Sequence, residues 1–208
     1  MTRGRFITLE GGEGAGKSTQ RAALATALRA GGLEVVETRE PGGSDGAEAI
    51  RDLLLTGGAD RWSPRAEALL FAAARADHLE RTIRPALDRG AWVLSDRFLD
   101  SSRAYQGAGE LTDADILALH RIGSADFFPD RTLVLMLPET EAEARAKARD
   151  GESTDRIGGR DRAFHRRVAD VFARLANEEP ARVRAIDASG EAGLVTARLL
   201  DALADLLP

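Results

Sequence analysis

The stretch that most constrains this chain is Gly-Gly-Glu-Gly-Ala-Gly-Lys-Ser, at residues 11–18. Just before it, Phe6–Leu9 forms a short apolar and partly β-branched run, which indicates a buried strand. After it, apolar residues recur at helical spacing until Gly31 and Gly32 end the run. A strand, a glycine loop with Lys and Ser at its end, and a helix together form the pattern of a phosphate-binding loop.

The expected chemistry of this loop depends on its main chain. Glycines let the backbone turn tightly, so that successive N–H groups and the positive end of the following helix face an anion. Lys17 supplies a mobile charge for the β and γ phosphates, and the Ser18 hydroxyl can bind Mg²⁺. The predicted phosphate-binding residues are Gly11, Gly12, Glu13, Gly14, Ala15, Gly16, Lys17, Ser18 and Thr19.

Strands and helices alternate along the rest of the chain. Further strands are predicted at Leu33–Thr38, Ala91–Ser95, Leu133–Leu137 and Val183–Asp187. Helices are predicted at Ala47–Leu55, at Ser63–Leu79 with a kink or interruption at Pro85, at Ser101–Gln106, from Leu111, and at Thr140–Arg149, Phe164–Glu178 and Leu194–Leu207. The polar, glycine-bearing residues 150–161 are predicted to form a mobile loop.

This alternation implies a mostly parallel sheet with helices on both faces. Ligands of such sheets bind beyond the carboxyl ends of the strands. The glycine loop, Arg39 and Glu40, Asp96 and Arg97, and the loop after Asp187 all follow predicted strands, so they should meet at that edge.

Composition narrows the class of protein. A chain of 208 residues with 43% hydrophobic and 30% charged residues suits one globular domain. The net charge of −5 and the lack of a long Lys/Arg run argue against a polymeric nucleic acid or a membrane as partner. The chain has no cysteine, and its N-terminal apolar run is too short for a signal peptide, so a cytoplasmic enzyme is expected.

Three charged residues follow predicted strands at the expected edge of the sheet. Asp96 stands where an acid of a phosphate-loop kinase holds Mg²⁺ directly or through water, and a surface ion pair is the alternative. Arg97 and Arg39 can each bind phosphate oxygens through two N–H groups, although a solvated role remains open for either residue alone. Their position beside the glycine loop favours phosphate binding.

Phe71 and Arg75 are four residues apart in a predicted helix and therefore share one face. An aromatic ring with a cationic donor beside it can stack on a nucleobase and bond its carbonyl edge. A core phenylalanine next to a solvated arginine fits the same spacing, and the spacing alone favours this simpler interpretation.

Basic residues surround the polar loop at residues 150–161. Arg145, Lys147, Arg149 and Arg156 fit an exposed helix end, where cations suit the helix dipole. They also fit a lid, spanning about residues 145–160, that closes to bring an arginine to a transferred phosphoryl group and to exclude water.

Taken together, these motifs resemble those of bacterial thymidylate kinase from end to end. Besides the glycine loop, the matching pieces are Thr38-Arg39-Glu40-Pro41-Gly42-Gly43, Phe71-Ala72-Ala73-Ala74-Arg75, Asp96-Arg97-Phe98, Asp100-Ser101-Ser102, Ala104-Tyr105-Gln106-Gly107, Asp155-Arg156-Ile157 and Ile186-Asp187-Ala188. The glycine loop alone indicates nucleotide binding, whereas the pieces Thr38–Gly43 and Ala104–Gly107 are far more specific. The resemblance implies one three-layer α/β domain over residues 1–208, of the P-loop NTPase type, with a five-stranded parallel sheet and a mobile lid.

The resemblance also implies the reaction, which is transfer of the ATP γ-phosphoryl group to dTMP with Mg²⁺. The implied substrate-binding residues are Arg39, Phe71, Arg75, Arg97, Ser102, Tyr105 and Gln106. Arg39 and Arg97 would bind the 5′-phosphate of dTMP, and Phe71 and Arg75 would contact thymine. Ser102 and Gln106 would face the base or sugar, and Tyr105 would crowd the 2′ position of the sugar.

The implied catalytic residues are Lys17, Arg97, Arg149 and Glu13, with Ser18 and Asp96 at the metal. The family has two arrangements, with a catalytic arginine either in the glycine loop or in the lid. The loop here contains no arginine, so the charge must come from Arg149 or Arg145, which would also contact the ATP phosphates.

The resemblance further implies a homodimer, formed through the helices near Ser63–Leu79 and Leu111–Ile122. Two rival functions remain open. One is a kinase for another nucleotide or nucleoside, and the other is a nucleotide-dependent switch protein, in which the acceptor-side residues would have no role.

Overall fold

The computed structural model describes residues 3–58, 60–107, 109–150 and 156–208. Five strands form one sheet in the order β2-β3-β1-β4-β5, and every neighbouring pair is parallel. The strands are β1 (Phe6–Gly11), β2 (Val35–Arg39), β3 (Trp92–Asp96), β4 (Arg131–Met136) and β5 (Val183–Asp187). The five predicted strands are therefore confirmed, with no bound shifted by more than two residues.

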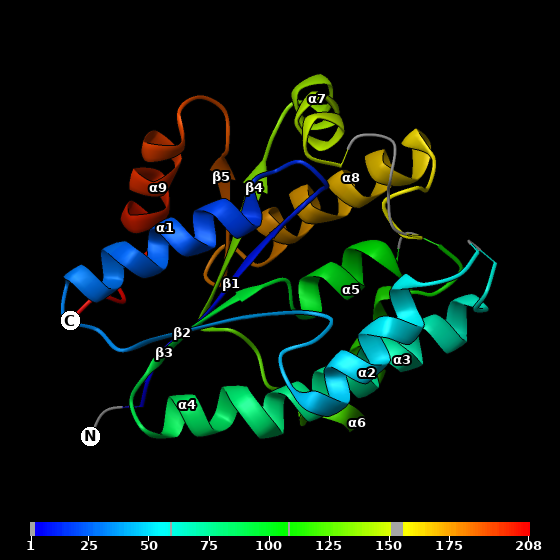
Figure 1. Ribbon diagram of the computed structural model, residues 1–208, viewed down its shortest axis with the longest axis horizontal. Coiled ribbons are helices and arrows are strands. Elements are labelled where there is room, and N and C mark those ends of the chain that lie inside the picture. The colour runs from blue at the N-terminus through cyan, green and yellow to red at the C-terminus, as the bar shows by residue number, and fades with distance from the viewer. Residues whose placement is uncertain (1–2, 59, 108, 151–155) are drawn as a thin grey trace.

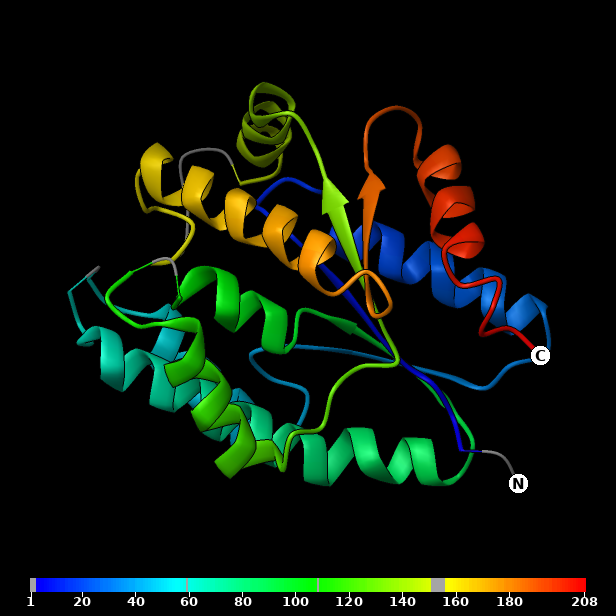
Figure 2. The same cartoon turned by 180° about the vertical axis from the view of Figure 1, so that it is seen from behind.

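Helices cover both faces of this sheet (Figure 1). They are α1 (Lys17–Ala30), α2 (Asp45–Leu55), α3 (Pro64–His78), a π-helical turn η1 (Leu79–Ile83), α4 (Arg84–Asp88), α5 (Leu99–Tyr105), α6 (Asp113–Ser124), α7 (Glu139–Asp150), α8 (Arg162–Glu178) and α9 (Ala192–Asp201). In both ribbon views α1 and α9 lie side by side on one face, while α4, α5, α6 and α8 lie on the other (Figures 1 and 2). The three predicted layers are confirmed.

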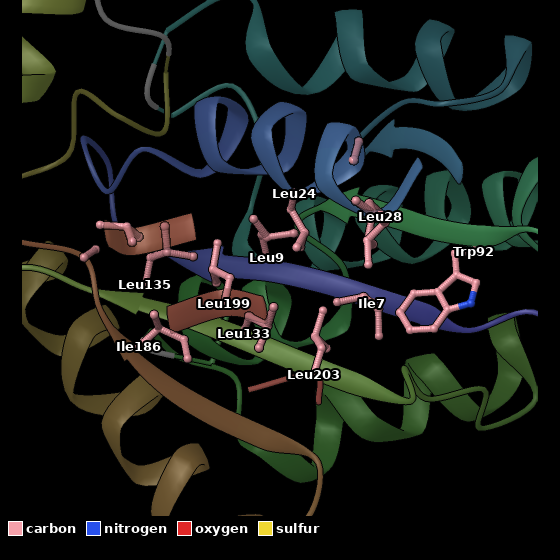
Figure 3. Close-up of a cluster of buried hydrophobic side chains, with 14 of the residues drawn as sticks. Ile7, Leu9, Leu24, Leu28, Trp92, Leu133, Leu135, Ile186, Leu199 and Leu203 are labelled. Atoms are coloured by element: carbon pink, nitrogen blue, oxygen red, sulfur yellow. The ribbon is translucent and has the colours of Figure 1, made fainter. Parts of the chain in front are cut away.

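The core between the sheet and the pair α1 and α9 is aliphatic. Ile7 and Leu9 of β1 point into it together with Leu133 and Leu135 of β4, as expected for alternate residues along a strand (Figure 3). Their partners are Leu24 and Leu28 of α1, Leu199 of α9 and Leu203 in the turns after α9, and all of these side chains are buried. This packing holds the first turn of α1 against the end of β1, where the glycine loop lies.

The other face of the sheet carries two further clusters. Phe6 and Val93 pack against Phe98 and Ile83, whereas Val134 and Val183 pack against α8. The ring of Phe98 meets that of Phe6 edge-on, with 4.8 Å between centroids. These contacts fix the start of α5, the helix that carries Ser102 and Tyr105 of the predicted acceptor site.

The predicted interruption near Pro85 is confirmed, and two other predicted features need correction. The interruption near Pro85 is a π-helical turn at Leu79–Ile83, which makes room for a proline that lacks an N–H, and the helix then resumes as α4. The last helix ends at Asp201, so residues 202–206 form turns instead of continuing to Leu207. Arg156 and Ile157, which belong to the polar segment predicted to form a mobile loop, are buried.

Candidate functional site

A cavity of about 580 Å³ lies at the carboxyl edge of the sheet. It is lined by all but three of the predicted site residues, namely Glu13, Gly14, Ala15, Gly16, Lys17, Ser18, Thr19, Arg39, Phe71, Arg75, Asp96, Arg97, Ser102, Tyr105, Gln106 and Arg145. Gly11 and Gly12 lead directly into this lining from β1. Arg149 lies in α7, but its side chain is outside the described residues.

The glycine loop needs its glycines at two positions for different reasons. A Cβ atom on Gly11 would lie 2.6 Å from the carbonyl oxygen of Leu135, so only glycine allows the two strands to approach this closely. Gly16 has a φ of 85°, in the left-handed region that other residues rarely adopt, and it begins α1. The loop conformation thus depends on glycine both for space and for backbone freedom.

The first turn of α1 is prepared for an anion. Within the described residues no side chain caps the start of this helix, and its first turn contains no acidic residue. Its N–H groups are therefore available to a phosphate, as expected for a site at a helix N-terminus. Lys17 lies across the loop, and its Nζ donates to the carbonyl oxygens of Gly11 and Gly12 at 3.2 and 2.7 Å.

The environment of Lys17 also affects its charge. Burial, together with the nearby charge of Arg97, lowers the pKa of Lys17 to about 8. An arriving phosphate would favour the charged form, so this ammonium group is suited to bind a polyanion.

Ser18 and Asp96 meet at the edge of the cavity, although one begins α1 and the other ends β3. Ser18 Oγ donates to Asp96 Oδ2 over 2.6 Å. A hydroxyl and a carboxylate oxygen are the hard ligands that Mg²⁺ prefers. These two oxygen ligands suit a metal that takes its other ligands from phosphate oxygens and water.

Arg97 connects the glycine loop with α5. Its Nη2 lies 2.6 Å from Glu13 Oε1 and 3.2 Å from the Tyr105 hydroxyl, and its Nη1 lies 3.1 Å from Ser101 Oγ. The guanidinium carbon also lies 4.7 Å from the centre of the Tyr105 ring. Burial raises the pKa of Tyr105 to about 12, so the hydroxyl that Arg97 contacts is neutral.

Arg39 lines the same cavity but points to a different partner. Its Nη2 donates to both carboxylate oxygens of Glu48, at 3.1 and 3.0 Å, and half of its side chain is exposed. Glu48 also accepts from the N–H of Gly43, and this bond is the main reason why its pKa is lowered. The structure thus brings Arg39 and Arg97 to one cavity without direct contact between them.

Arg75 is buried and held on three sides, which excludes the simpler interpretation of a solvated side chain. Its Nε donates to Glu40 Oε2 at 2.9 Å, and its Nη2 donates to Ser102 Oγ at 2.8 Å and to the carbonyl oxygen of Phe98 at 3.1 Å. Among the described residues no acceptor meets Nη1. A rigid guanidinium with a donor to spare at a cavity wall is suited to bond a ligand carbonyl.

The remaining acceptor-side residues surround Arg75. Phe71 is partly buried one helical turn before it and lines the cavity, so it serves the core and the cavity together. Gln106 Nε2 donates to Glu67 Oε1 at 3.0 Å. Glu67 is buried and also pairs with Arg156 at 2.6 Å and Arg160 at 2.9 Å, which ties the segment after residue 155 to α3.

The loop after β5 reaches this cavity, as predicted. Ala188, Gly190, Ala192 and Val195 line it there. Arg145 of α7 reaches this loop, with Nη1 3.3 Å from the carbonyl oxygen of Ala188, and its Nη2 contacts Glu141 at 2.5 Å.

Some lining residues were missed by sequence reasoning. Arg51 lines the cavity and donates to the carbonyl oxygen of Pro41 at 2.7 Å. It lies in a predicted helix among apolar residues, and nothing in that pattern distinguishes it from a solvated arginine. Glu40 was predicted at this edge beside Arg39 but was given no role, because its buried pairing with Arg75 and His78 depends on tertiary packing.

The strand order, the uncapped glycine loop and an arginine-rich cavity beside it define a nucleotide kinase of the P-loop class. The model of the thymidylate kinase family matches residues 9–199. The chain therefore belongs to the thymidylate kinase family.

Individual relatives agree with this assignment over their whole length. The chain is 66% identical over 206 residues to the thymidylate kinase of Rhizorhabdus wittichii, covering 99% of each chain. It is 51% identical over 210 residues to that of Caulobacter vibrioides, covering 100% of this chain and 99% of the relative. The crystal structure of thymidylate kinase from Ehrlichia chaffeensis is similar with a TM-score of 0.76 and 31% identity, covering 97% of this chain and 99% of that one.

Proposed function

We propose that the protein transfers the γ-phosphoryl group of ATP to dTMP, giving ADP and dTDP, with Mg²⁺ as cofactor. The observation that carries this proposal is the shared cavity. One continuous cavity is lined by the glycine loop on one side and by Phe71, Arg75 and Tyr105 on the other. A donor and an acceptor nucleotide can therefore meet with their phosphates between the two halves.

The donor half is assigned to ATP. The main-chain amides of the glycine loop and the Lys17 ammonium would hold the β and γ phosphates. The loop after β5, with Ala188 and Gly190, also lines the cavity and would lie toward the adenine base.

The acceptor half is assigned to dTMP. Phe71 would stack on thymine, and the spare donor of Arg75 would bond a carbonyl oxygen of the base. Arg97 and Arg39 would bind the 5′-phosphate, which requires Arg39 to leave Glu48 for the stronger negative charge of a phosphate. Tyr105 would lie against the sugar, and the neutral hydroxyl would remain bonded to Arg97.

Ser18 and Asp96 would hold the Mg²⁺, directly or through water. When bound, Mg²⁺ supplies positive charge that neutralises the phosphate oxygens. Asp96 also interacts electrostatically with Lys17 and Arg97. The Ser18–Asp96 pair therefore lies beside cations that would neutralise the charge of the two nucleotides.

No strong general base is needed, because the acceptor of the phosphoryl group is itself an anionic phosphate. The residues must hold two polyanions in line and neutralise their repulsion, which is the main source of catalysis in phosphoryl transfer. Arg97 contacts Glu13 on the glycine-loop side of the cavity and Tyr105 on the other side, so its charge would reduce the repulsion between the two nucleotides. The lid arginine, Arg149 or Arg145, would add charge at the transferred group.

Substrate choice tests the proposal. ADP release is measured with ATP, Mg²⁺ and a panel of dTMP, dUMP, dCMP, dAMP, dGMP, UMP and thymidine. We expect dTMP to give the highest kcat/KM and each non-pyrimidine to fall far below it. A preference for another monophosphate or for a nucleoside would support the rival kinase, and ADP release without any acceptor dependence would support the switch protein.

We further propose a homodimer formed through α3 and α6. Both helices carry large apolar side chains that are exposed in the single chain, with Leu69 at 56% and Ile122 at 83%.

Within the described residues no helix combines the length and apolar character of a membrane span.

A further inference from the structure

Glu10 is a buried carboxyl that the proposed mechanism leaves without a role. It belongs to β1, directly before Gly11, and its side chain is 0% exposed. It is not among the described residues that line the cavity. Its carboxyl group instead faces the turn between β3 and α5, where Oε1 accepts from the N–H of Phe98 at 2.8 Å and Oε2 lies 2.5 Å from Ser101 Oγ.

The turn that Glu10 contacts holds Arg97 in an unusual conformation. Arg97 has a φ of 72°, which is left-handed and unfavourable for a residue with a side chain. Such a conformation persists only when surrounding contacts determine it, and it is commonly found at functional sites. Here the Arg97 N–H donates to the carbonyl oxygen of Leu9 at 3.0 Å, and Ser95 Oγ donates to the Arg97 carbonyl oxygen at 2.7 Å.

Glu10 adds a further contact at Phe98, the residue after Arg97. Its bond to the Phe98 N–H fixes the peptide group that follows Arg97, so the backbone is held on both sides of the left-handed residue. Its second oxygen contacts Ser101 Oγ, and the same Oγ accepts from Arg97 Nη1 at 3.1 Å. One carboxyl group therefore acts on both the main chain and the guanidinium of Arg97 without reaching the substrate cavity.

Two adjacent buried acids differ in their partners. Asp100 is also 0% exposed, but Arg182 donates to both of its oxygens, at 2.6 and 3.0 Å, and Arg103 lies 3.3 Å away. Glu10 has no such direct cation among the described residues. Burial, reinforced by the negative charge of Asp100, raises the pKa of Glu10 to about 8. A neutral carboxyl can donate to Ser101 Oγ while accepting from Phe98, and a glutamine amide can do the same.

We propose that Glu10 is a positioning residue that holds Arg97 in the left-handed turn and thereby places its guanidinium for the acceptor phosphate. This inference rests on the proposed function, in which Arg97 binds the 5′-phosphate of dTMP. Because β1 continues from Glu10 into the glycine loop, one residue fixes the acceptor-binding arginine relative to the donor-binding loop.

The test compares three substitutions with a matched control. Glu10→Gln retains an acceptor for Phe98 and a donor for Ser101, Glu10→Asp shortens the side chain, and Glu10→Ala removes both bonds. The control is Thr8→Ala, which removes another buried polar group on the same strand, one that bonds Thr132 Oγ1 at 3.0 Å and does not touch the turn. KM for dTMP, KM for ATP, kcat and urea unfolding are measured for each.

We expect Glu10→Ala and Glu10→Asp to raise KM for dTMP by about tenfold or more and to lower kcat, with KM for ATP changed by less than about twofold. Glu10→Gln should restore KM for dTMP to within about twofold of wild type. Thr8→Ala should lose stability without this selective change in KM. A purely structural role would move the unfolding midpoint and leave the ratio of the two KM values unchanged.

The remaining outcomes overturn either the role of Glu10 or the proposed function. If folded Glu10→Ala keeps the wild-type KM for dTMP, the inference is wrong, and if Glu10→Ala does not fold, the same result for Glu10→Asp overturns it. Equal impairment of Glu10→Gln and Glu10→Ala would overturn the assignment to these two hydrogen bonds. If wild-type protein itself does not phosphorylate dTMP, the proposed function fails first, and that result is seen before any variant is compared.

Discussion

The hydroxyl of Ser18 donates to the carboxylate of Asp96 across 2.6 Å, although 78 positions separate the two residues in the sequence. Ser18 belongs to the first turn of α1, and Asp96 is the last residue of β3. The parallel register places Asp96 opposite Leu9, near the end of β1 that leads into the glycine loop. The contact is therefore a direct consequence of strand order β3-β1 and of the loop that starts α1.

This pair leads to a prediction about metal dependence. Asp96→Asn should lower kcat by roughly 100-fold and raise the Mg²⁺ concentration that gives half-maximal activity, because an amide oxygen is a weaker metal ligand than a carboxylate. The measurement is ADP release over a Mg²⁺ titration. Asp187→Asn is the matched control, since Asp187 also ends a strand, but its carboxylate accepts from the Ser189 hydroxyl and does not line the cavity. The same Mg²⁺ shift in both variants would contradict the assignment.

Arg75→Ala should separate the two substrates. Because Arg75 lies in the acceptor half, we expect KM for dTMP to rise by more than about tenfold and KM for ATP to stay within about twofold. The variant should also be less stable by about 3–5 kcal/mol, since it leaves the buried Glu40 carboxylate without its 2.9 Å partner. Steady-state kinetics and urea unfolding measure the two effects. An equal rise in both KM values would count against recognition of the base.

A second substitution distinguishes lost recognition from lost stability. Adding Glu40→Gln to Arg75→Ala removes the unpaired charge, so the double variant should regain much of the lost stability. It should not regain affinity for dTMP, because the donor to the base is still missing. Recovery of both properties together would mean that Arg75 acts only through the packing of α3.

The lid arginines differ in their expected effects. Arg149→Ala should lower kcat more than it raises KM for dTMP, because its charge is assigned to the transferred phosphoryl group. Arg145→Ala should mainly raise KM for ATP, since Arg145 lies against the loop after β5. Steady-state kinetics of both variants decide between them. The reverse pattern would assign the catalytic charge to Arg145, one helical turn earlier.

His120 predicts how stability depends on pH. Its side chain is 1% exposed, Nε2 donates to the carbonyl oxygen of Phe127 at 3.0 Å, and Nδ1 has no partner among the described residues. Burial, with the charge of Arg75, lowers the pKa of His120 from 6.5 to about 4. Between these values the unfolded chain binds a proton that the folded protein does not.

This difference in proton binding gives the direction in which stability changes with pH. The stabilising contribution is complete above pH 6.5 and is lost as the pH falls toward 4, with a slope of at most about 1.4 kcal/mol per pH unit. Urea unfolding of wild type and His120→Gln at several pH values between 7.5 and 4.5 gives the difference due to this group. Parallel curves for the two proteins would show that His120 does not titrate in this way.

The sequence predicted those features that depend on local patterns. The strand, glycine loop and helix at the N-terminus were correct because each is determined by neighbouring residues. The predicted start of α3 at Ser63 was also correct, and in the structure the Ser63 side chain accepts from the N–H of Ala66. The meeting of strand ends at one edge was also predictable, since a parallel sheet requires it. The residues at these ends were therefore assigned to one site before their distances were known.

Other features depend on packing between distant segments. Arg97 and Glu13 are 84 positions apart, and nothing local indicates that they form an ion pair. The spacing of Phe71 and Arg75 favoured a solvated arginine, and only the position of Glu40 at the end of β2 shows why Arg75 is buried. The left-handed turn at Arg97 was also missed, because arginine carries no signal for that conformation. These are properties of the tertiary structure and not of any single stretch.

The apolar residues on α3 and α6 lead to a prediction about assembly. Leu69 and Ile122 are exposed on these two helices, which pack together on the face of the sheet opposite α1 and α9 (Figures 1 and 2). Burial of such side chains in an interface contributes about 25 cal/mol per Å² of apolar surface. Single exposed leucines are common, but the continuation of a packed helix pair into two large exposed side chains favours an interface.

We therefore expect Leu69→Asp combined with Ile122→Asp to convert a dimer into a monomer, because two buried charges in an apolar interface are strongly unfavourable. Light scattering coupled to size-exclusion chromatography measures the mass. Leu194→Asp is the matched control, since Leu194 is 58% exposed on α9, on the opposite face of the sheet, and this variant should remain a dimer. If the double variant keeps the wild-type mass, or if wild type is itself a monomer, α3 and α6 do not form the interface.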